Sequence, residues 1–72
     1  MKETFELTTE YIPLCDLLKV CGVTETGGVA KLLVADGEVL VDGEVELRKR
    51  AKIRPGSLVT GEGFEIRVVA GR

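Results

Sequence analysis

The dipeptide Asp42-Gly43, set between two runs of alternating residues, constrains the fold of this chain more than any other feature. Residues 39–41 precede it and residues 44–47 follow it. Asp-Gly is typical of two-residue hairpin turns, because both turn positions must accept a positive φ angle. The sequence therefore predicts an antiparallel hairpin over residues 39–47, and the other elements must be arranged around it.

Two short helices are predicted before this hairpin. The first begins near Pro13, which suits an opening turn, and ends at Gly22, which favours a left-handed stop. Its apolar face recurs at intervals of three and four positions and consists of Leu14, Leu17, Leu18 and Cys21. The second helix is expected to start after Thr26, whose hydroxyl can cap free backbone N–H groups, and to end at Gly37. Its expected buried stripe is Ala30, Leu33 and Val34, with Val29 alongside.

Period-two alternation predicts strands at both ends of the chain. Residues 4–8 fit a half-buried strand, and residues 58–60 and 64–68 fit a last hairpin around residues 61–63. The expected fold class is therefore α+β, with two short helices packed on a small, mostly antiparallel β-sheet. At 72 residues, the chain is expected to form a single domain over residues 1–72.

A run of cations follows the central hairpin at residues 48–54, called here the basic segment. Its members are Arg48, Lys49, Arg50, Lys52 and Arg54. Residues 1–47 hold three cations and ten acids, a net of −7, whereas residues 48–72 hold seven cations and two acids, a net of +5. A concentrated basic run on an otherwise acidic chain is typical of a site for a polyanion.

The geometry of the basic segment depends on whether it stays extended. In an extended strand, side chains alternate between the two faces. One face would then carry Arg48, Arg50, Lys52 and Arg54, and the other Lys49, Ala51 and Ile53. The alternative interpretation is a solvated strand face whose cations balance the acids of residues 36–46.

The start of the second helix is a further candidate for anion binding. Thr26, Gly27 and Gly28 would leave backbone donors and the positive end of the helix dipole exposed, and Lys31 lies one turn further on. An ordinary helix cap is the alternative. Lys19, in the last turn of the first helix, is a weaker candidate, because a cation there also complements the helix dipole.

Several classes of function are disfavoured. The chain contains no His, and Cys15 and Cys21 form no CxxC pattern, so neither a metal site nor His-dependent catalysis is expected. The two cysteines are interpreted as small buried side chains. No nucleophile, base and orienter set is apparent, so we expect a non-enzyme without a cofactor or small-molecule substrate. No long apolar run suggests a signal peptide or membrane span, so a cytoplasmic location is expected.

The aromatic residues indicate which kind of nucleic acid is plausible. Phe5 and Phe64 fall at apolar positions of predicted strands, which leaves only Tyr11 for stacking on a base. Single-strand binders usually stack bases on several exposed aromatic side chains. The composition therefore favours phosphate contacts with a structured RNA that is recognised by its shape.

The pattern as a whole resembles a known family. The residues that carry the resemblance are Leu14, Leu17, Gly22, Thr26, Ala30, Leu33, Val34, Val39, Val41, Asp42 and Gly43. They resemble, without a gap, the αL motif of the RNA-binding domain named for small-subunit ribosomal protein S-four, over about residues 12–60. Residues 26–28, 30–31, 41–46 and 48–50 further resemble the small stand-alone bacterial YbcJ-like and YaaA-like proteins.

The resemblance implies RNA binding with no enzymatic activity in the domain itself. Carried onto this sequence, the family's RNA surface would comprise Thr26, Gly27, Gly28, Lys31, Arg48, Lys49, Arg50 and Lys52. By the same analogy, the RNA would be ribosomal RNA or a ribosome-assembly intermediate.

Two other interpretations compete with RNA binding. In the first, the acidic half docks a basic protein partner and the basic segment only balances charge. In the second, the chain is a sulfur carrier of ubiquitin-like fold. Such carriers resemble one another in a Gly-Gly terminus, whereas this chain closes with residues 70–72, Ala-Gly-Arg, and places both helices before the main hairpin. The sequence leaves the oligomeric state open.

Overall fold

The elements of the computed structural model, which describes residues 1–71, bear out the predicted order of helices and hairpins. In chain order they are β1 (Lys2–Leu7), β2 (Ile12–Pro13), α1 (Leu14–Val20), α2 (Gly27–Ala35), β3 (Val39–Val41), β4 (Glu44–Val45), β5 (Lys52–Ile53), β6 (Leu58–Gly61) and β7 (Phe64–Ala70).

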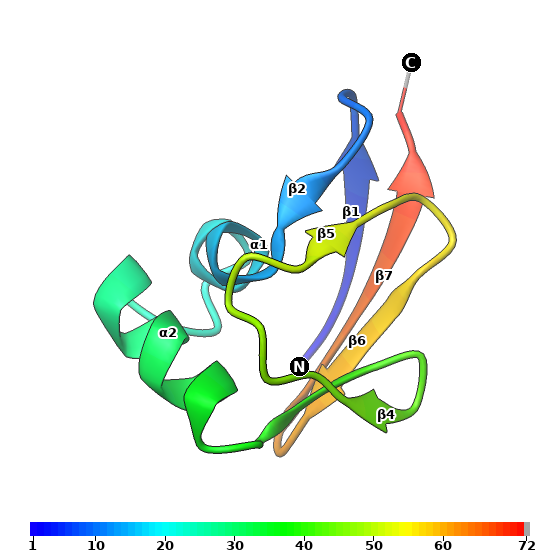
Figure 1. Cartoon of the computed structure of the whole chain (residues 1–72). Coiled ribbons are helices and arrows are strands. Elements are labelled where there is room, and N and C mark those ends of the chain that lie inside the picture. The colour runs from blue at the N-terminus through cyan, green and yellow to red at the C-terminus, as the bar shows by residue number, and fades with distance from the viewer. Residues whose placement is uncertain (72) are drawn as a thin grey trace.

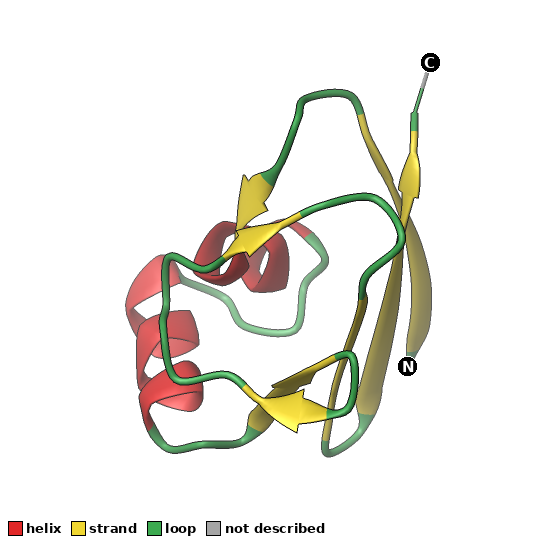
Figure 2. Ribbon diagram, turned by 45° about the vertical axis from the view of Figure 1, so that its right-hand side comes forward, coloured by secondary structure: helices red, strands yellow, loops and turns green. Residues whose placement is uncertain are grey.

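A five-stranded sheet forms one layer of the molecule, and both helices lie on the same side of it (Figures 1 and 2). The strand order is β1-β7-β6-β3-β4. Strands β1 and β7 run parallel, with Lys2 opposite Glu65 and Leu7 opposite Ala70, and the other neighbours are antiparallel. The α+β class and the mostly antiparallel sheet are therefore confirmed. A separate two-stranded pair, β2 with β5, lies beside α1.

The core lies between the helices and the sheet. Helix α1 contributes Leu14, Leu17 and Leu18, all fully buried, which confirms three members of its predicted apolar face. The fourth, Cys21, is the C-cap residue and is only partly buried. Helix α2 contributes only Ala30 and Val34 as fully buried side chains. The sheet side of the core consists mainly of Val39, Val59, Ile66 and Val68. Each element thus buries one face, as its sequence period requires.

Both helices end as the sequence predicts. Gly22 has a φ angle of +79° and Gly37 one of +76°, which a residue with a Cβ atom rarely adopts. After α1, the N–H of Gly22 donates to the carbonyl of Lys19 and that of Val23 donates to Leu18, both at 3.0 Å. The paired bonds satisfy carbonyls that the helix leaves free.

The central hairpin also follows its sequence signal. Asp42 and Gly43 have φ angles of 53° and 87°, and β3 pairs with β4 on either side of them. The second strand, Glu44–Val45, is shorter than predicted, and beyond it the N–H of Glu46 still donates to the carbonyl of Val39 at 3.0 Å.

The prediction for the basic segment is wrong in its first half. Lys49 and Arg50 form a turn, closed by the N–H of Ala51 donating to the carbonyl of Arg48 at 3.1 Å. The alternation expected of an extended strand holds only beyond that turn, where Ala51 and Ile53 are buried and Lys52 is exposed. Lys49, which an extended segment would place on the same face as Ala51 and Ile53, is exposed as well.

No helix in the described part of the chain is long and apolar enough to cross a membrane. Among residues 1–71, no group of three or more acidic, His or Cys side chains is arranged to hold a metal ion.

Candidate nucleic-acid interface

The amino end of α1 fixes the position of the basic segment. The first N–H groups of a helix have no partner within the helix and need acceptors from elsewhere. Here the N–H of Leu14 donates to the carbonyl of Ala51, and the N–H of Cys15 donates to the carbonyl of Lys49, both at 2.9 Å. The turn at residues 49–50 brings the chain around this helix end. Its carbonyls therefore face inward, and the side chains of Lys49 and Arg50 face solvent.

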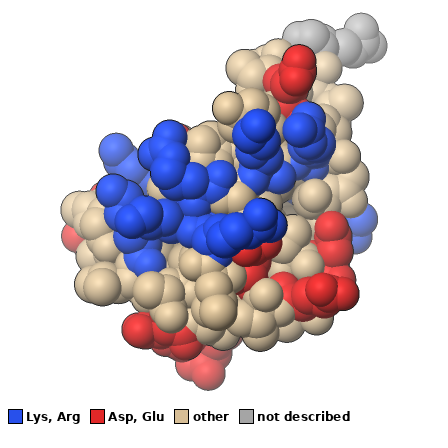
Figure 3. Space-filling model, viewed as in Figure 1, with Lys and Arg blue, Asp and Glu red and all other residues tan. Residues whose placement is uncertain are grey.

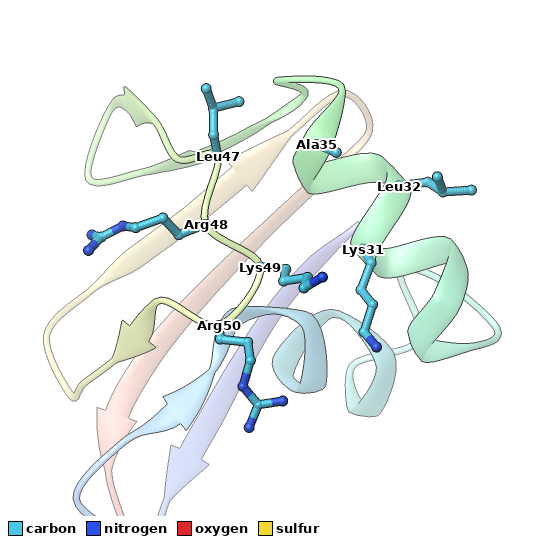
Figure 4. Close-up of a pocket in the computed structure, with 7 residues that line it drawn as sticks. All are labelled: Lys31, Leu32, Ala35, Leu47, Arg48, Lys49 and Arg50. Carbon is cyan, nitrogen blue, oxygen red and sulfur yellow. The ribbon is translucent and has the colours of Figure 1, made fainter.

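An open hollow of about 530 Å³ separates this turn from α2, and we call it the first hollow. Four of its seven lining residues are cations and the other three are apolar. They are Lys31, Arg48, Lys49 and Arg50, with Leu32, Ala35 and Leu47. Figure 4 shows Lys49 reaching from the turn toward α2, from which Lys31 projects. Cations that converge in this way repel one another, so the hollow favours an anion.

A second hollow, of about 490 Å³, adjoins the first and is also basic. It is lined by Arg48, Arg50, Ala51 and Lys52, so the two hollows share both arginines. In space-filling view, the Lys and Arg side chains form a nearly continuous band across this face (Figure 3). The acidic side chains visible in that view lie mostly along its margins. On this face, the cations therefore lie together, and Lys31 from the acidic half of the sequence lies with those of residues 48–54.

Tyr11 lies beside the last two cations of the basic segment. The Nζ atom of Lys52 lies 5.0 Å from the centre of the Tyr11 ring, and the Cζ atom of Arg54 lies 5.9 Å from it. Both distances are within the range of cation–π attraction. The Tyr11 residue is 38% exposed, so its ring holds two cations on the surface and remains accessible.

One cation of the basic segment is paired with an acid of residues 36–46, as the alternative interpretation of this segment predicts for its cations in general. The Nε atom of Arg48 donates to Oε2 of Glu46 at 3.0 Å, and its Nη2 atom donates to Oε1 at 3.2 Å. The backbone N–H of Arg48 donates to the same Oε2 atom at 3.0 Å. The side-chain hydrogen bond from Arg48, followed by the backbone bond, lowers the pKa of Glu46. Glu46 therefore stays ionised and offsets part of the charge of the basic segment.

The amino end of α2 has the predicted cap. Thr26 is the N-cap residue, and its Oγ1 atom accepts from the N–H of Val29 at 3.2 Å. Gly27 has no other atom within 4 Å of the place a Cβ would occupy, so the approach to the first turn is open there. Gly28 would meet only the Thr26 hydroxyl, at 3.8 Å.

The predicted residues divide into those that the structure brings together and those that it does not. Lys31, Arg48, Lys49, Arg50 and Lys52 line the two hollows. Thr26, Gly27 and Gly28 precede Lys31 on α2 but line neither hollow. Arg54 also lies outside the hollows, beside Tyr11, and Lys19 occupies the last turn of α1.

Sequence reasoning missed the apolar members of the first hollow. Leu32 falls outside the stripe expected for α2 and is 66% exposed, and Leu47 is 62% exposed. The signal available in the sequence was that neither leucine is needed to complete an apolar face. Val29, expected alongside the stripe, is also largely exposed.

Comparison with known proteins places these features in a family context. The model of the S4 domain family matches residues 5–69. The chain is 50% identical, over 60 residues, to the putative RNA-binding protein YbcJ of Escherichia coli (strain K12), covering 83% of this chain and 86% of that protein. It is 38% identical, over 64 residues, to the probable ribosome maturation protein RlbA of Bacillus subtilis (strain 168), covering 89% and 90% respectively.

A solved structure is similar as well. The solution structure of YbcJ from E. coli, described as revealing an αL motif involved in RNA binding, superposes with a TM-score of 0.74 at 48% identity. The match covers 93% of this chain and 86% of that one. The αL architecture expected from the sequence is therefore confirmed.

Proposed function

This chain belongs to the S4 domain family, and from that premise we propose that it binds the phosphates of a structured RNA through the basic face of Figure 3. The proposed contacts are Lys31, Arg48, Lys49, Arg50, Lys52 and Arg54, with the amino end of α2 at Thr26, Gly27 and Gly28 and a peripheral contact at Lys19. The proposed RNA-binding domain spans residues 1–72, with the αL core over about residues 12–60, and acts without catalysis.

The observation that carries this proposal is the convergence of Lys31, Lys49 and Arg50 on the first hollow from two elements far apart in the sequence. Like charges held together in this way raise the local concentration of an anion, and a phosphate backbone presents anions at regular spacing. Exposed lysine and arginine side chains bind phosphate oxygens without reading bases. Recognition by shape and backbone is the usual mode for a folded RNA.

For the identity of the RNA, we propose ribosomal RNA or an assembly intermediate of the ribosome, in the cytoplasm. The similarity to the probable ribosome maturation protein of B. subtilis supports this choice. It predicts that the protein co-sediments with ribosomal particles in a bacterial lysate and that ribonuclease treatment releases it. Co-sedimentation that survives ribonuclease would instead favour a protein partner.

The test of the basic face is a pair of charge-matched double variants. Lys49→Glu with Arg50→Glu reverses two exposed cations of the first hollow, whereas Lys2→Glu with Arg67→Glu reverses two exposed cations on β1 and β7. Each pair changes the net charge from −2 to −6, because each reversal removes two units.

Binding of a folded ribosomal RNA fragment is measured by fluorescence anisotropy, and circular dichroism checks that each variant folds. We expect the first pair to weaken binding at least about tenfold, since two phosphate contacts become repulsive, and the second to weaken it far less. Equal losses from the two pairs would mean that net charge, and not this face, governs binding, and the proposal would be wrong.

A further inference from the structure

The first hollow contains an apolar floor that phosphate binding alone does not explain. The floor consists of Leu32, Ala35 and Leu47. Leu32 is 66% exposed and Leu47 is 62% exposed. The residues of α2 that are buried in the core are Ala30 and Val34. Figure 4 shows Leu47 and Leu32 on opposite sides of Ala35, and Lys31, Lys49 and Arg50 lie below all three in that view. A hydrated phosphate gains nothing from contact with leucine, so the floor calls for a second kind of group.

A nucleotide carries both kinds of group within one unit. Its base has two flat faces of low polarity, and a phosphate lies on either side of it along the chain. A paired base keeps these faces stacked inside the helix and cannot reach a protein floor, whereas an extruded base can. The volume of about 530 Å³ falls within the range of about 300–1,000 Å³ that is usual for small-molecule pockets.

We propose that the first hollow holds a single unpaired nucleotide of the RNA, with its base on the floor of Leu32, Ala35 and Leu47 and its flanking phosphates on Lys31, Lys49 and Arg50. This inference rests on the proposed function, which it deepens by giving the protein a preference for a bulged or looped-out position in the RNA. The base contact is aliphatic, because the lining residues include no aromatic ring. The site therefore favours an extruded base of any type over a particular sequence.

The test compares two RNA hairpins that differ by one nucleotide. The first carries one bulged 2-aminopurine in its stem, and the second is fully paired with 2-aminopurine at the matching place. Anisotropy gives the two Kd values. We expect the bulged hairpin to bind about three to ten times more tightly, from the extra apolar surface covered. The fluorescence of the bulged 2-aminopurine is expected to rise on binding, because the base leaves its stacked neighbours and meets no aromatic side chain.

Matched variants test whether the preference for the bulged hairpin depends on the apolar floor of the first hollow. Leu32→Ala with Leu47→Ala removes most of the floor, and alanine at position 32 keeps a good helix former in α2. The ratio of the two Kd values is expected to fall to about one. Val20→Ala truncates a side chain that is 60% exposed on α1 and lines neither hollow, so the ratio should stay as in the parent.

The outcomes separate the two proposals. If the protein binds both hairpins with equal affinity and the 2-aminopurine signal does not change, the nucleotide pocket is wrong and the RNA-binding function stands. If it binds neither hairpin nor the ribosomal RNA fragment, the proposed function is wrong. If an acidic, leucine-containing peptide binds in a manner that depends on Leu32 and Leu47 while the hairpins show no preference, the floor serves a protein partner and the inference is overturned.

Discussion

Replacing Glu46 by Gln should strengthen RNA binding, because the Glu46 carboxylate forms an ion pair with the guanidinium group of Arg48. Both of its oxygens accept from Arg48, at 3.0 and 3.2 Å. The side chain of Arg48 is 80% exposed and that of Glu46 only 18%. Once released from Glu46, the arginine could therefore reach the phosphates of a bound RNA. A glutamine amide oxygen can still accept the backbone N–H of Arg48, which keeps the local conformation.

The magnitude follows from counting phosphate contacts. Within residues 1–71, four cations lining the two hollows form no ion pair: Lys31, Lys49, Arg50 and Lys52. At about 0.7–0.9 per contact, these four cations should contribute about −2.8 to −3.6 to the slope of log K against log salt for the parent. Arg48 is the one proposed contact among the described residues whose charge an acid offsets, so releasing it from Glu46 should make the slope steeper by up to about 0.7–0.9. Between about 50 and 200 mM salt, the advantage of the variant over the parent should then shrink about threefold.

The assay is an anisotropy titration of the same RNA at four or five salt concentrations. Glu44→Gln is the matched control, since it removes one exposed carboxylate from the same hairpin and also changes the net charge from −2 to −1 without freeing an arginine. The control should raise affinity slightly and leave the slope unchanged. If Glu46→Gln has the same slope as Glu44→Gln, or a shallower one, then Glu46 does not withhold Arg48 from RNA and the argument fails.

Three further predictions concern stability and reactivity. Gly61→Ala should cost about 1–3 kcal/mol in urea unfolding, because a Cβ atom there would lie 2.9 Å from the carbonyl of Glu38 and clash with the ring of Phe64; an unchanged midpoint would contradict the close approach. Because the pKa of Glu46 is lowered by Arg48, its contribution to stability should be complete above the usual Glu value of about 4.3 and disappear as pH falls through the lowered value. The difference in melting temperature between parent and Glu46→Gln should accordingly narrow in acid. Burial, followed by the charge of Glu3, raises the pKa of Cys21, so iodoacetamide should label this thiol slowly at neutral pH and rapidly after unfolding.

Local signals predicted most of the fold. Gly22, Gly37 and Asp42-Gly43 each adopt positive φ angles, which glycine allows without strain and Asp tolerates better than most residues. The ends of both helices and the central hairpin therefore followed from the sequence. The pair β2–β5 could not be predicted in this way, because a strand of two residues is too short to show alternation of apolar and polar residues. The parallel pairing of β1 with β7 depends on packing of the whole chain.

The basic residues of the candidate site could be predicted from the sequence, whereas the shape of the site could not. Every basic residue that lines the hollows was identified from composition and position. The turn at residues 49–50 was not, because the donors it satisfies belong to Leu14 and Cys15, far away in the sequence. The ion pair of Arg48 with Glu46 joins residues two positions apart, and no sequence signal marked it. The apolar floor depends on how α2 rotates against the core, which leaves Leu32 outside.

The pairing of β1 with β7 has a consequence for how the molecule folds. Its register joins Lys2 to Glu65 and so closes a loop of more than sixty residues, whereas each hairpin joins neighbours in the chain. Closing a long loop carries a larger entropic cost and is slower than forming local contacts. We therefore expect the edge strand β1 to pair with β7 late in folding, after the helices and hairpins have begun to form.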